Sequence, residues 1–241
     1  MPGLDWLTSR PIAHRGLHDA AAGVIENTAS AFTAAVAGHY AIECDLQLSA
    51  DGEAMVFHDS TLDRLTTAQG PVAAMTAREL QAVPFKATAD RMMTLGELCA
   101  LVEDRVPLVI ELKSNFNSDT RMAARAADVL RSYAGPAAVM SFDPAMIAAV
   151  AGVAPDLPRG VVGERGLLQS HGISDSAYLQ ALMKARPQFL AWSVKDLRSA
   201  LPWTTRNLFG LPLLTWTVRS LADWSRAKGD ADQMIFEGFR P

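Results

Sequence analysis

The chain has 241 residues, 49% hydrophobic and 20% charged, a balance that suits a folded domain with a sizeable core and excludes a disordered chain. The formal net charge of −4, without a long basic run, makes nucleic acid an unexpected partner. The longest apolar run, Met146 to Ala154, has nine residues, whereas a membrane-spanning helix needs about 20. No secretory signal is evident, and Cys44 and Cys99 form no metal-binding or disulfide pattern, so we expect a soluble cytoplasmic protein without stable membrane insertion.

Apolar or β-branched runs alternate with alanine-rich helical stretches along the chain, which predicts β/α units and a mostly parallel sheet. The expected strands are 11–14, 41–48, 54–58, 107–112, 137–142, 160–163, 189–193, 213–218 and 233–237. The expected helices are 28–37, 76–81, 95–103, 120–133, 144–152, 176–185, 196–201 and 221–227. No change in composition marks a second domain, and the length is typical of an α/β barrel. We therefore predict one TIM-type (β/α)8 barrel over residues 1–241.

Nine strands are one more than an eight-stranded barrel holds, and an Asp51-Gly52 pair between two of them suggests why. Asp-Gly between strand-like runs is a strong hairpin signal, because glycine readily adopts positive φ. We expect the run 54–58 to be an antiparallel addition to the barrel. A two-residue turn would place Asp45 opposite His58, whereas a longer loop would shift that register.

Two pairs of ionisable residues, two positions apart, end predicted apolar strands: Glu43 with Asp45, and Glu111 with Lys113. Residues at this spacing share one face of a strand, and active sites lie at the carboxyl ends of barrel strands. Burying four such groups is costly without a metal or a charged ligand. Internal salt bridges, for instance between Glu111 and Arg15, are the alternative interpretation.

Several ionisable side chains of different kinds are expected at this same edge of the barrel, because they lie at the ends of predicted strands. They are two histidines, two cations and three carboxylates: His14, His58, Arg15, Lys113, Glu43, Asp45 and Glu111. Three carboxylates offer the oxygen ligands that suit Mg²⁺ or Ca²⁺. The arginine and the lysine suit an anionic group such as phosphate, and two imidazoles can divide proton transfer between them. The set indicates cleavage of a phosphate ester in a small-molecule substrate.

The motifs that contain these residues resemble those of the glycerophosphodiester phosphodiesterase family. They occur in the family's order over the first 115 residues, with a weaker match near the end. The motifs are Ala13-His14-Arg15-Gly16, Glu26-Asn27-Thr28, Glu43-Cys44-Asp45, Val56-Phe57-His58-Asp59, Ile110-Glu111-Leu112-Lys113 and Trp216-Thr217-Val218.

The resemblance implies a TIM-type barrel, a divalent metal bound by Glu43, Asp45 and Glu111, and His14 with His58 as the acid/base pair. It implies hydrolysis of a glycerophosphodiester to glycerol 3-phosphate and an alcohol, with attack by the glycerol 2-hydroxyl through a cyclic phosphate as the route. Related alternatives are a phospholipase-type phosphodiesterase acting on lysophospholipids and a phosphate-binding barrel without catalysis.

Other residues carry weaker signals. Trp216 is expected to contact the substrate, whereas Trp192 and Phe142 are either core or an apolar rim of the pocket. Glu26 and Asn27 either begin a helix or support the site from the first loop. The histidines in polar loop contexts are expected at the surface; they are His18, His39 and His171.

The chain departs from the family pattern in two places. Only 47 residues separate Asp59 from Pro107, so the insertion that family members often carry after the second histidine is expected to be short, near residues 60–94. The closing strand, which usually ends in Thr-Asp, here reads Phe236-Glu237, so the resemblance assigns no role to Glu237.

Overall fold

A computed structural model describes residues 3–166 and 175–241, and His171 lies outside them. Eight parallel strands follow one another around a barrel, which closes because β1 pairs with both β2 and β9. The predicted (β/α)8 barrel is confirmed. Its strands are β1 (Ile12–Ala13), β2 (Ala41–Leu48), β4 (Leu108–Leu112), β5 (Ala137–Ser141), β6 (Arg159–Gly163), β7 (Phe189–Ser193), β8 (Leu213–Val218) and β9 (Gln233–Phe236).

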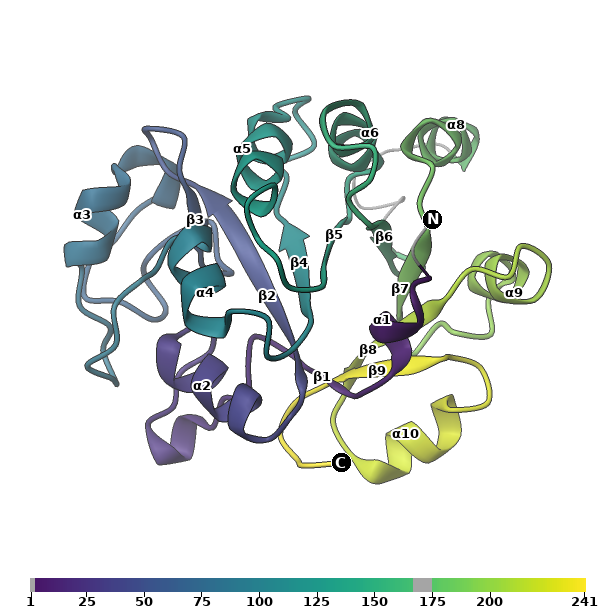
Figure 1. Cartoon of the computed structure of the whole chain (residues 1–241), viewed down its shortest axis with the longest axis horizontal. Helices are drawn as coiled ribbons and strands as arrows, with labels where there is room; N and C mark the ends of the chain where they lie inside the picture. Colours follow the sequence, from purple (N-terminus) through teal and green to yellow (C-terminus); the bar gives the residue numbers. More distant parts are fainter. Residues whose placement is uncertain (1–2, 167–174) are drawn as a thin grey trace.

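Helices surround the strands, as Figure 1 shows. Several begin with the expected capping residues: Thr94 and Glu97 form a reciprocal capping box, and Asp143 caps a helix whose first residue is Pro144. The helices are α1 (Asp5–Thr8), α2 (Ala29–Ala37), α3 (Ala77–Ala82), α4 (Leu95–Val102), α5 (Arg121–Leu130), α6 (Pro144–Val153), α8 (Asp175–Ala185), α9 (Ala200–Asn207) and α10 (Leu221–Ala227), with 3-10 turns η1 (Ala20–Ala22) and η2 (Val72–Ala74).

Strand alternation separates the barrel interior from the layer beneath the helices. Along β2, Ile42 and Cys44 pack in the cluster that includes helix side chains, whereas Ala41 packs in the interior cluster. Glu43 and Asp45 share the parity of Ala41, so the alternation directs both carboxylates inward. At the amino-terminal end, Leu7 of α1 is 1% exposed and packs into the interior cluster, which closes that end of the barrel.

The strand β3 (Ala54–Val56) pairs antiparallel with β2, which confirms the predicted hairpin but corrects its register. Leu46 lies opposite Val56, and Ser49 pairs with Glu53, so the loop holds three residues instead of two. The Ser49 hydroxyl accepts a hydrogen bond from the Glu53 N–H at 2.8 Å, and Gly52 has φ +83°. Asp45 therefore lies opposite Phe57, and His58 follows the end of the strand.

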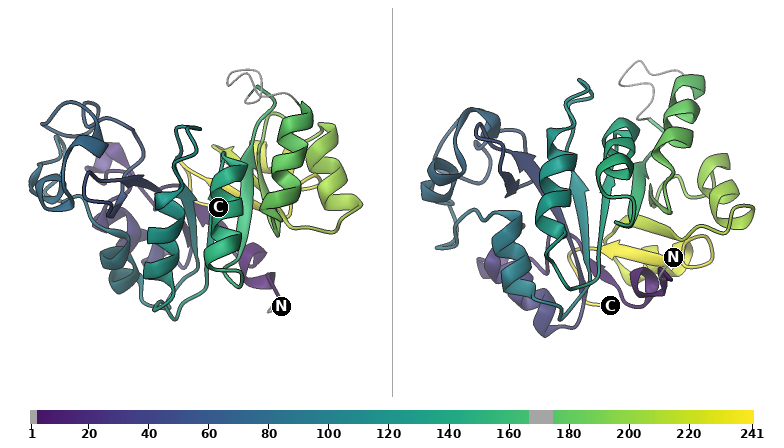
Figure 2. Two further views of the ribbon diagram at one scale, coloured as in Figure 1. Left: turned by 90° about the horizontal axis from the view of Figure 1, so that it is seen from above. Right: turned by 45° about the horizontal axis from the view of Figure 1, so that its top comes forward.

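The chain between β3 and α4 projects from one side of the barrel (Figures 1 and 2). It has a hydrophobic cluster of its own, in which Leu62, Val72, Leu80 and Phe85 pack against Phe57. Two short local elements, η2 and α3, lie within this segment. Its packing holds the polypeptide that carries His58 close to the barrel.

One predicted helix was wrong. The sequence suggested a helix over 196–201, but residues 194–199 form turns and bends, and α9 begins at Ala200 with Pro202 in its first turn. Proline is tolerated in the first turn of a helix, because the N–H that it lacks would have no partner there. No helix among the described residues is long and apolar enough to cross a membrane.

Candidate active site

Three buried carboxylates meet inside the barrel where β2 and β4 pair. Asp45 lies directly opposite Glu111 in the parallel register, and Glu43 precedes Asp45 on the same face. One oxygen from each lies within 4.8 Å of the other two, and the side chains of Glu43 and Asp45 are only 1% exposed. The strand alternation that the sequence displayed thus brings the three predicted metal ligands together.

Two cations partly balance these carboxylates. Lys113 Nζ lies 2.8 Å from Asp45 Oδ1 and 2.6 Å from Glu111 Oε1, while Arg15 Nε lies 3.2 Å from Asp45 Oδ2. Burial would raise the pKa of Asp45, but the charges of Lys113 and Arg15 outweigh it and hold this pKa well below its usual value. The internal salt bridges weighed at the sequence level do form, although Glu111 pairs with Lys113 and not with Arg15.

Glu43 lacks such compensation. Its Oε2 accepts the Arg15 backbone N–H at 2.9 Å, and its ion-pair contact in the described chain is with His14 Nε2 at 3.9 Å. Burial, and then the negative charges of Asp45 and Glu111, raise the pKa of Glu43 well above its usual value. Three carboxylates against two cations leave excess negative charge among oxygen ligands, so the residues fit a divalent cation such as Mg²⁺ or Ca²⁺.

His14 follows β1 and is held by Glu237, which follows β9. The distance from His14 Nδ1 to Glu237 Oε2 is 2.6 Å. Burial lowers the pKa of His14, although the hydrogen bond to Glu237 opposes this effect. A neutral imidazole in this arrangement donates its Nδ1–H to the carboxylate and leaves Nε2 free to accept a proton.

His58 has a similar arrangement on the chain segment that follows β3. Its Nδ1 lies 2.7 Å from Asp59 Oδ1, and Arg64 donates to both oxygens of Asp59 at 2.6 and 2.9 Å. Burial would raise the pKa of Asp59, but Arg64 and His58 lower it to about 2. Burial lowers the pKa of His58 itself, against the opposing charge of Asp45.

The first loop links these groups from outside the barrel. Glu26 accepts hydrogen bonds from Arg15 at 2.7 Å and from Arg64 at 2.7 and 3.0 Å, so one carboxylate joins both sides of the site. Asn27 is 1% exposed, and its side-chain amide donates to Asp45 Oδ2 at 2.9 Å. The helix α2 begins just beyond, with Thr28 as its N-cap residue. Both residues therefore contact site side chains directly.

A cavity of about 240 Å³ opens where these groups meet. Both predicted histidines line it, together with the cations, two of the carboxylates and an apolar wall. Phe142 and Trp216 form part of that wall, with ring centroids 5.4 Å apart. The lining residues include His14, Arg15, Glu43, His58, Glu111, Lys113, Phe142 and Trp216.

Comparisons with known proteins show which family the chain belongs to. The family model for the glycerophosphoryl diester phosphodiesterase family matches residues 14–234. The chain belongs to this family. It is therefore placed among the phosphoric diester hydrolases. A glycerophosphodiester phosphodiesterase of Caldanaerobacter subterraneus subsp. tengcongensis is 33% identical over 168 residues, which are 66% of this chain and 68% of that protein.

Solved structures show the same fold. A phosphodiesterase of Oleispira antarctica, solved in complex with the product sn-glycerol-3-phosphate, has a TM-score of 0.80 at 20% identity and covers 96% of this chain and 94% of its own. The glycerophosphodiester phosphodiesterase of Thermotoga maritima has a TM-score of 0.73 at 22% identity, with 93% and 92% covered. At these identities the similarity is one of barrel architecture.

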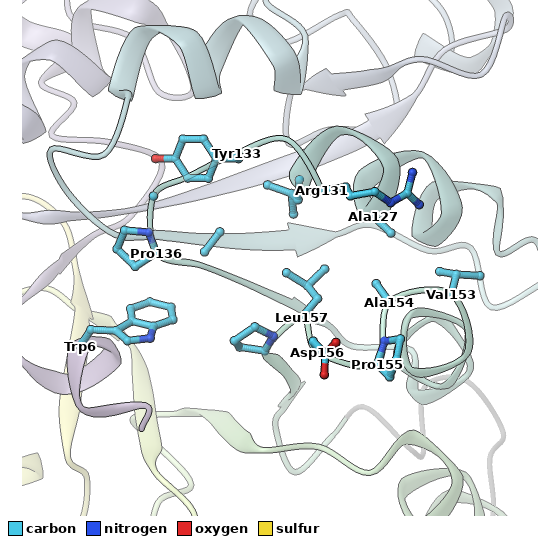
Figure 3. A pocket seen from close by; sticks show the side chains of 14 residues that line it. Trp6, Ala127, Arg131, Tyr133, Pro136, Val153, Ala154, Pro155, Asp156 and Leu157 are labelled. Carbon is cyan, nitrogen blue, oxygen red and sulfur yellow. The ribbon is translucent and has the colours of Figure 1, made fainter. Parts of the chain in front are cut away.

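A second cavity of this phosphodiesterase lies at the other end of the barrel strands. It has a volume of about 480 Å³ and is lined by Trp6, Pro136 and Leu157, among others (Figure 3). Its charged side chains are Arg131 and Asp156, and it holds neither a histidine pair nor a carboxylate cluster. The amino-terminal end of a barrel serves stability more often than catalysis. Most of the side chains that the sequence motifs predict for the site thus line the smaller cavity and not this one.

Sequence reasoning missed two residues near the site, and the structure decides between the two interpretations of Trp192 in favour of the core. Glu237 and His18, whose side chains are 19% and 20% exposed, lie against each other, so His18 is not a simple surface residue. Trp192 is 5% exposed and packs with Leu190 and Leu213 in a cluster outside the barrel interior. The signal for Glu237 was its place at the end of the last strand.

Proposed function

We propose that this chain hydrolyses glycerophosphodiesters to glycerol 3-phosphate and an alcohol, with a divalent ion at Glu43, Asp45 and Glu111. The acid/base pair is His14 and His58. The observation that carries the proposal is that both imidazoles line one cavity of about 240 Å³ together with Glu43 and Glu111 of the carboxylate cluster. Membership of the family supplies the reaction class.

The bound ion would polarise the phosphoryl oxygens and offset their negative charge, which Mg²⁺ and Ca²⁺ both do. Arg15 and Lys113 bring two further positive charges to the same cavity. Both side chains are fixed by carboxylates, so they meet the phosphate without reorganising. Arg15 and Lys113 do not balance the negative charge of the three carboxylates, so the site still needs a bound cation.

Each imidazole has its Nδ1 fixed by a carboxylate, which leaves Nε2 for proton transfer. One Nε2 accepts the proton of the glycerol 2-hydroxyl as that oxygen attacks phosphorus. The other donates a proton to the oxygen of the departing alcohol, so that a cyclic phosphate and the free alcohol result. Water then opens the cyclic phosphate with the two roles exchanged.

The apolar wall supports a role for Trp216 in contacting the carbon skeleton of the substrate. Its indole N–H donates to the Ala191 carbonyl at 3.1 Å, and Phe142 packs edge-on against its ring, so its orientation is fixed. Glu26 and Asn27 support the site by holding Arg15, Arg64 and Asp45. We also propose that residues 60–94 are a short insertion within a single domain.

The test is release of glycerol 3-phosphate from glycerophosphocholine in Mg²⁺ or Ca²⁺. We expect activity that excess chelator removes and that either metal restores. The variant His58→Ala should lose activity, and His39→Ala, which alters an exposed histidine away from the cavity, is the matched control. Full activity in chelator would overturn the metal assignment, and activity retained by His58→Ala would overturn the acid/base pair.

Two further substrates separate the related alternatives. A glycerophosphodiester without the 2-hydroxyl should remain intact, because the attacking oxygen is absent. Lysophosphatidylcholine in place of glycerophosphocholine tests the phospholipase alternative, and preference for it would replace the proposed substrate. Binding of glycerol 3-phosphate without turnover of either diester would indicate the non-catalytic barrel.

A further inference from the structure

A second group of metal-binding side chains lies beside the catalytic cavity. His14, His18 and Glu237 each offer a ligand atom, and these atoms lie within 4.8 Å of one another. His14 follows β1, His18 lies four residues later in the first loop, and Glu237 follows β9. The group shares no residue with the carboxylate cluster of Glu43, Asp45 and Glu111.

His18 is the member whose ring nitrogen is left without a hydrogen bond by the described residues. Its Nε2 is buried and has no hydrogen-bond partner among the described residues, although the side chain is 20% exposed. The nearest carboxylate oxygen is Glu237 Oε2 at 3.6 Å, beyond the range of a hydrogen bond. A buried polar atom without a partner is costly, so a ligand that satisfies it would stabilise the loop.

The donor set differs in kind from that of the carboxylate cluster. Two imidazole nitrogens and one carboxylate oxygen suit Zn²⁺ and similar transition-metal ions, whereas Mg²⁺ and Ca²⁺ prefer oxygen alone. Ligands of tetrahedral Zn²⁺ lie about 3.3 Å apart when each is about 2.0 Å from the ion. The distances of 2.6 and 3.6 Å from Glu237 Oε2 to the two histidines lie on either side of this value.

We propose that His14, His18 and Glu237 bind a transition-metal ion of the Zn²⁺ class, at a site separate from the carboxylate cluster. The ion would replace the hydrogen bond between His14 Nδ1 and Glu237 Oε2. The site has its own access, because His18 and Glu237 line a cavity of about 490 Å³ that His14 does not line. Arg219 contacts the other oxygen of Glu237, Oε1, at 2.7 Å and is 61% exposed, so it can move away from an arriving cation.

Occupancy would inhibit the enzyme, a consequence that rests on the function proposed for His14. Coordination through Nδ1 moves the imidazole proton to Nε2, where His14 would otherwise accept a proton from the substrate. Glu237 would at the same time cease to orient the ring. The site would therefore make hydrolysis sensitive to Zn²⁺ without involving the ion that hydrolysis requires.

The experiment measures Zn²⁺ binding by titration calorimetry with the carboxylate cluster kept saturated by Mg²⁺. We expect one Zn²⁺ site in the wild-type protein and at least tenfold weaker binding in His18→Ala, with His39→Ala as the control that binds normally. Co²⁺ in place of Zn²⁺ should give a visible absorption band that His18→Ala loses. No Zn²⁺ binding, or equal affinity in wild type and His18→Ala, would overturn the proposal.

An activity measurement tests the inhibitory effect separately. In excess Mg²⁺, Zn²⁺ should inhibit hydrolysis of glycerophosphocholine by the wild type, and His18→Ala should resist inhibition while its activity without Zn²⁺ is unchanged. Inhibition that added Mg²⁺ relieves equally in both proteins would assign Zn²⁺ to the carboxylate cluster instead. If the chain did not hydrolyse the diester at all, the calorimetric result would still decide the metal site.

Discussion

Ionisable side chains enter the cavity mainly from the first half of the barrel, and apolar side chains enter from the second. The segments from β1 to β4 carry both histidines and the carboxylate cluster, whereas β5 to β8 carry Met140, Phe142, Val162 and Trp216. The first half is thus equipped for charge and proton transfer, and the second for contact with carbon. This division explains why recognisable motifs are concentrated before Ser114, since an apolar wall admits many sequences.

The largest expected effect is in the first half, at His14. The variant His14→Ala should reduce kcat for glycerophosphocholine by roughly 10²- to 10⁴-fold, because it removes one partner in proton transfer. KM should change little if the phosphate contacts remain. Steady-state kinetics in saturating Mg²⁺ measure both, and a kcat within twofold of wild type would show that proton transfer does not need this imidazole.

The variant Glu43→Gln should weaken metal binding and, at the same time, stabilise the metal-free fold. Metal affinity should fall more than about 100-fold, measured by calorimetry, because a charged ligand is lost. The pKa of Glu43 is raised in the folded state, so its stabilising contribution exists at low pH and is lost as the pH rises above its usual pKa near 4.5. The neutral variant should therefore melt at a higher temperature than the metal-free wild type at pH 7. A lower Tm would contradict this interpretation of the cluster.

The two histidines can be distinguished by the pH dependence of kcat/KM. Burial lowers the pKa of His14 below 6.5 and Glu237 opposes that effect, so Glu237→Gln should lower this pKa further. If His14 is the base, the acidic limb of the profile begins below pH 6.5 and moves to lower pH in the variant. If the acidic limb does not move in the variant, the limb reports the pKa of His58. If it moves to higher pH, the described role of Glu237 is contradicted.

The smallest effect is expected in the second half of the barrel. Phe142→Leu removes an aromatic contact worth about 0.5–1.5 kcal/mol, so kcat/KM should fall about 2- to 10-fold, mainly through KM. The matched control is Trp203→Leu, an aromatic side chain on α9 that is 54% exposed. A selective fall in kcat for Phe142→Leu would show that the two halves do not divide their tasks in this way.

The charged half of the site was predictable from sequence because strand alternation fixes its geometry. Glu43 and Asp45 share a face whichever residue begins the strand, and the apolar residues around them identify that strand as buried. The hairpin register was not predictable to one residue. It depended on the Ser49 hydroxyl, which accepts the Glu53 N–H and extends the loop.

The apolar half was less accessible to sequence analysis. Parallel strands covered on both faces are apolar at every position, so the sequence does not say which parity faces the interior. Trp216 has the parity of Leu214, which packs inside the barrel, whereas Trp192 has the parity of Leu190, which packs beneath the helices. Only the assembled barrel distinguishes the two tryptophans.

The hydrogen bond between His14 and Glu237 joins positions 223 residues apart. During synthesis His14 leaves the ribosome early, and Glu237, the carboxylate partner of His14, emerges only after seven further barrel strands have been made. The orienting bond therefore cannot form on a nascent chain that lacks β9. Closure of the barrel and completion of the proton-transfer site therefore occur together. Because the contact between His14 and Glu237 spans so much of the sequence, we expect this step late in folding.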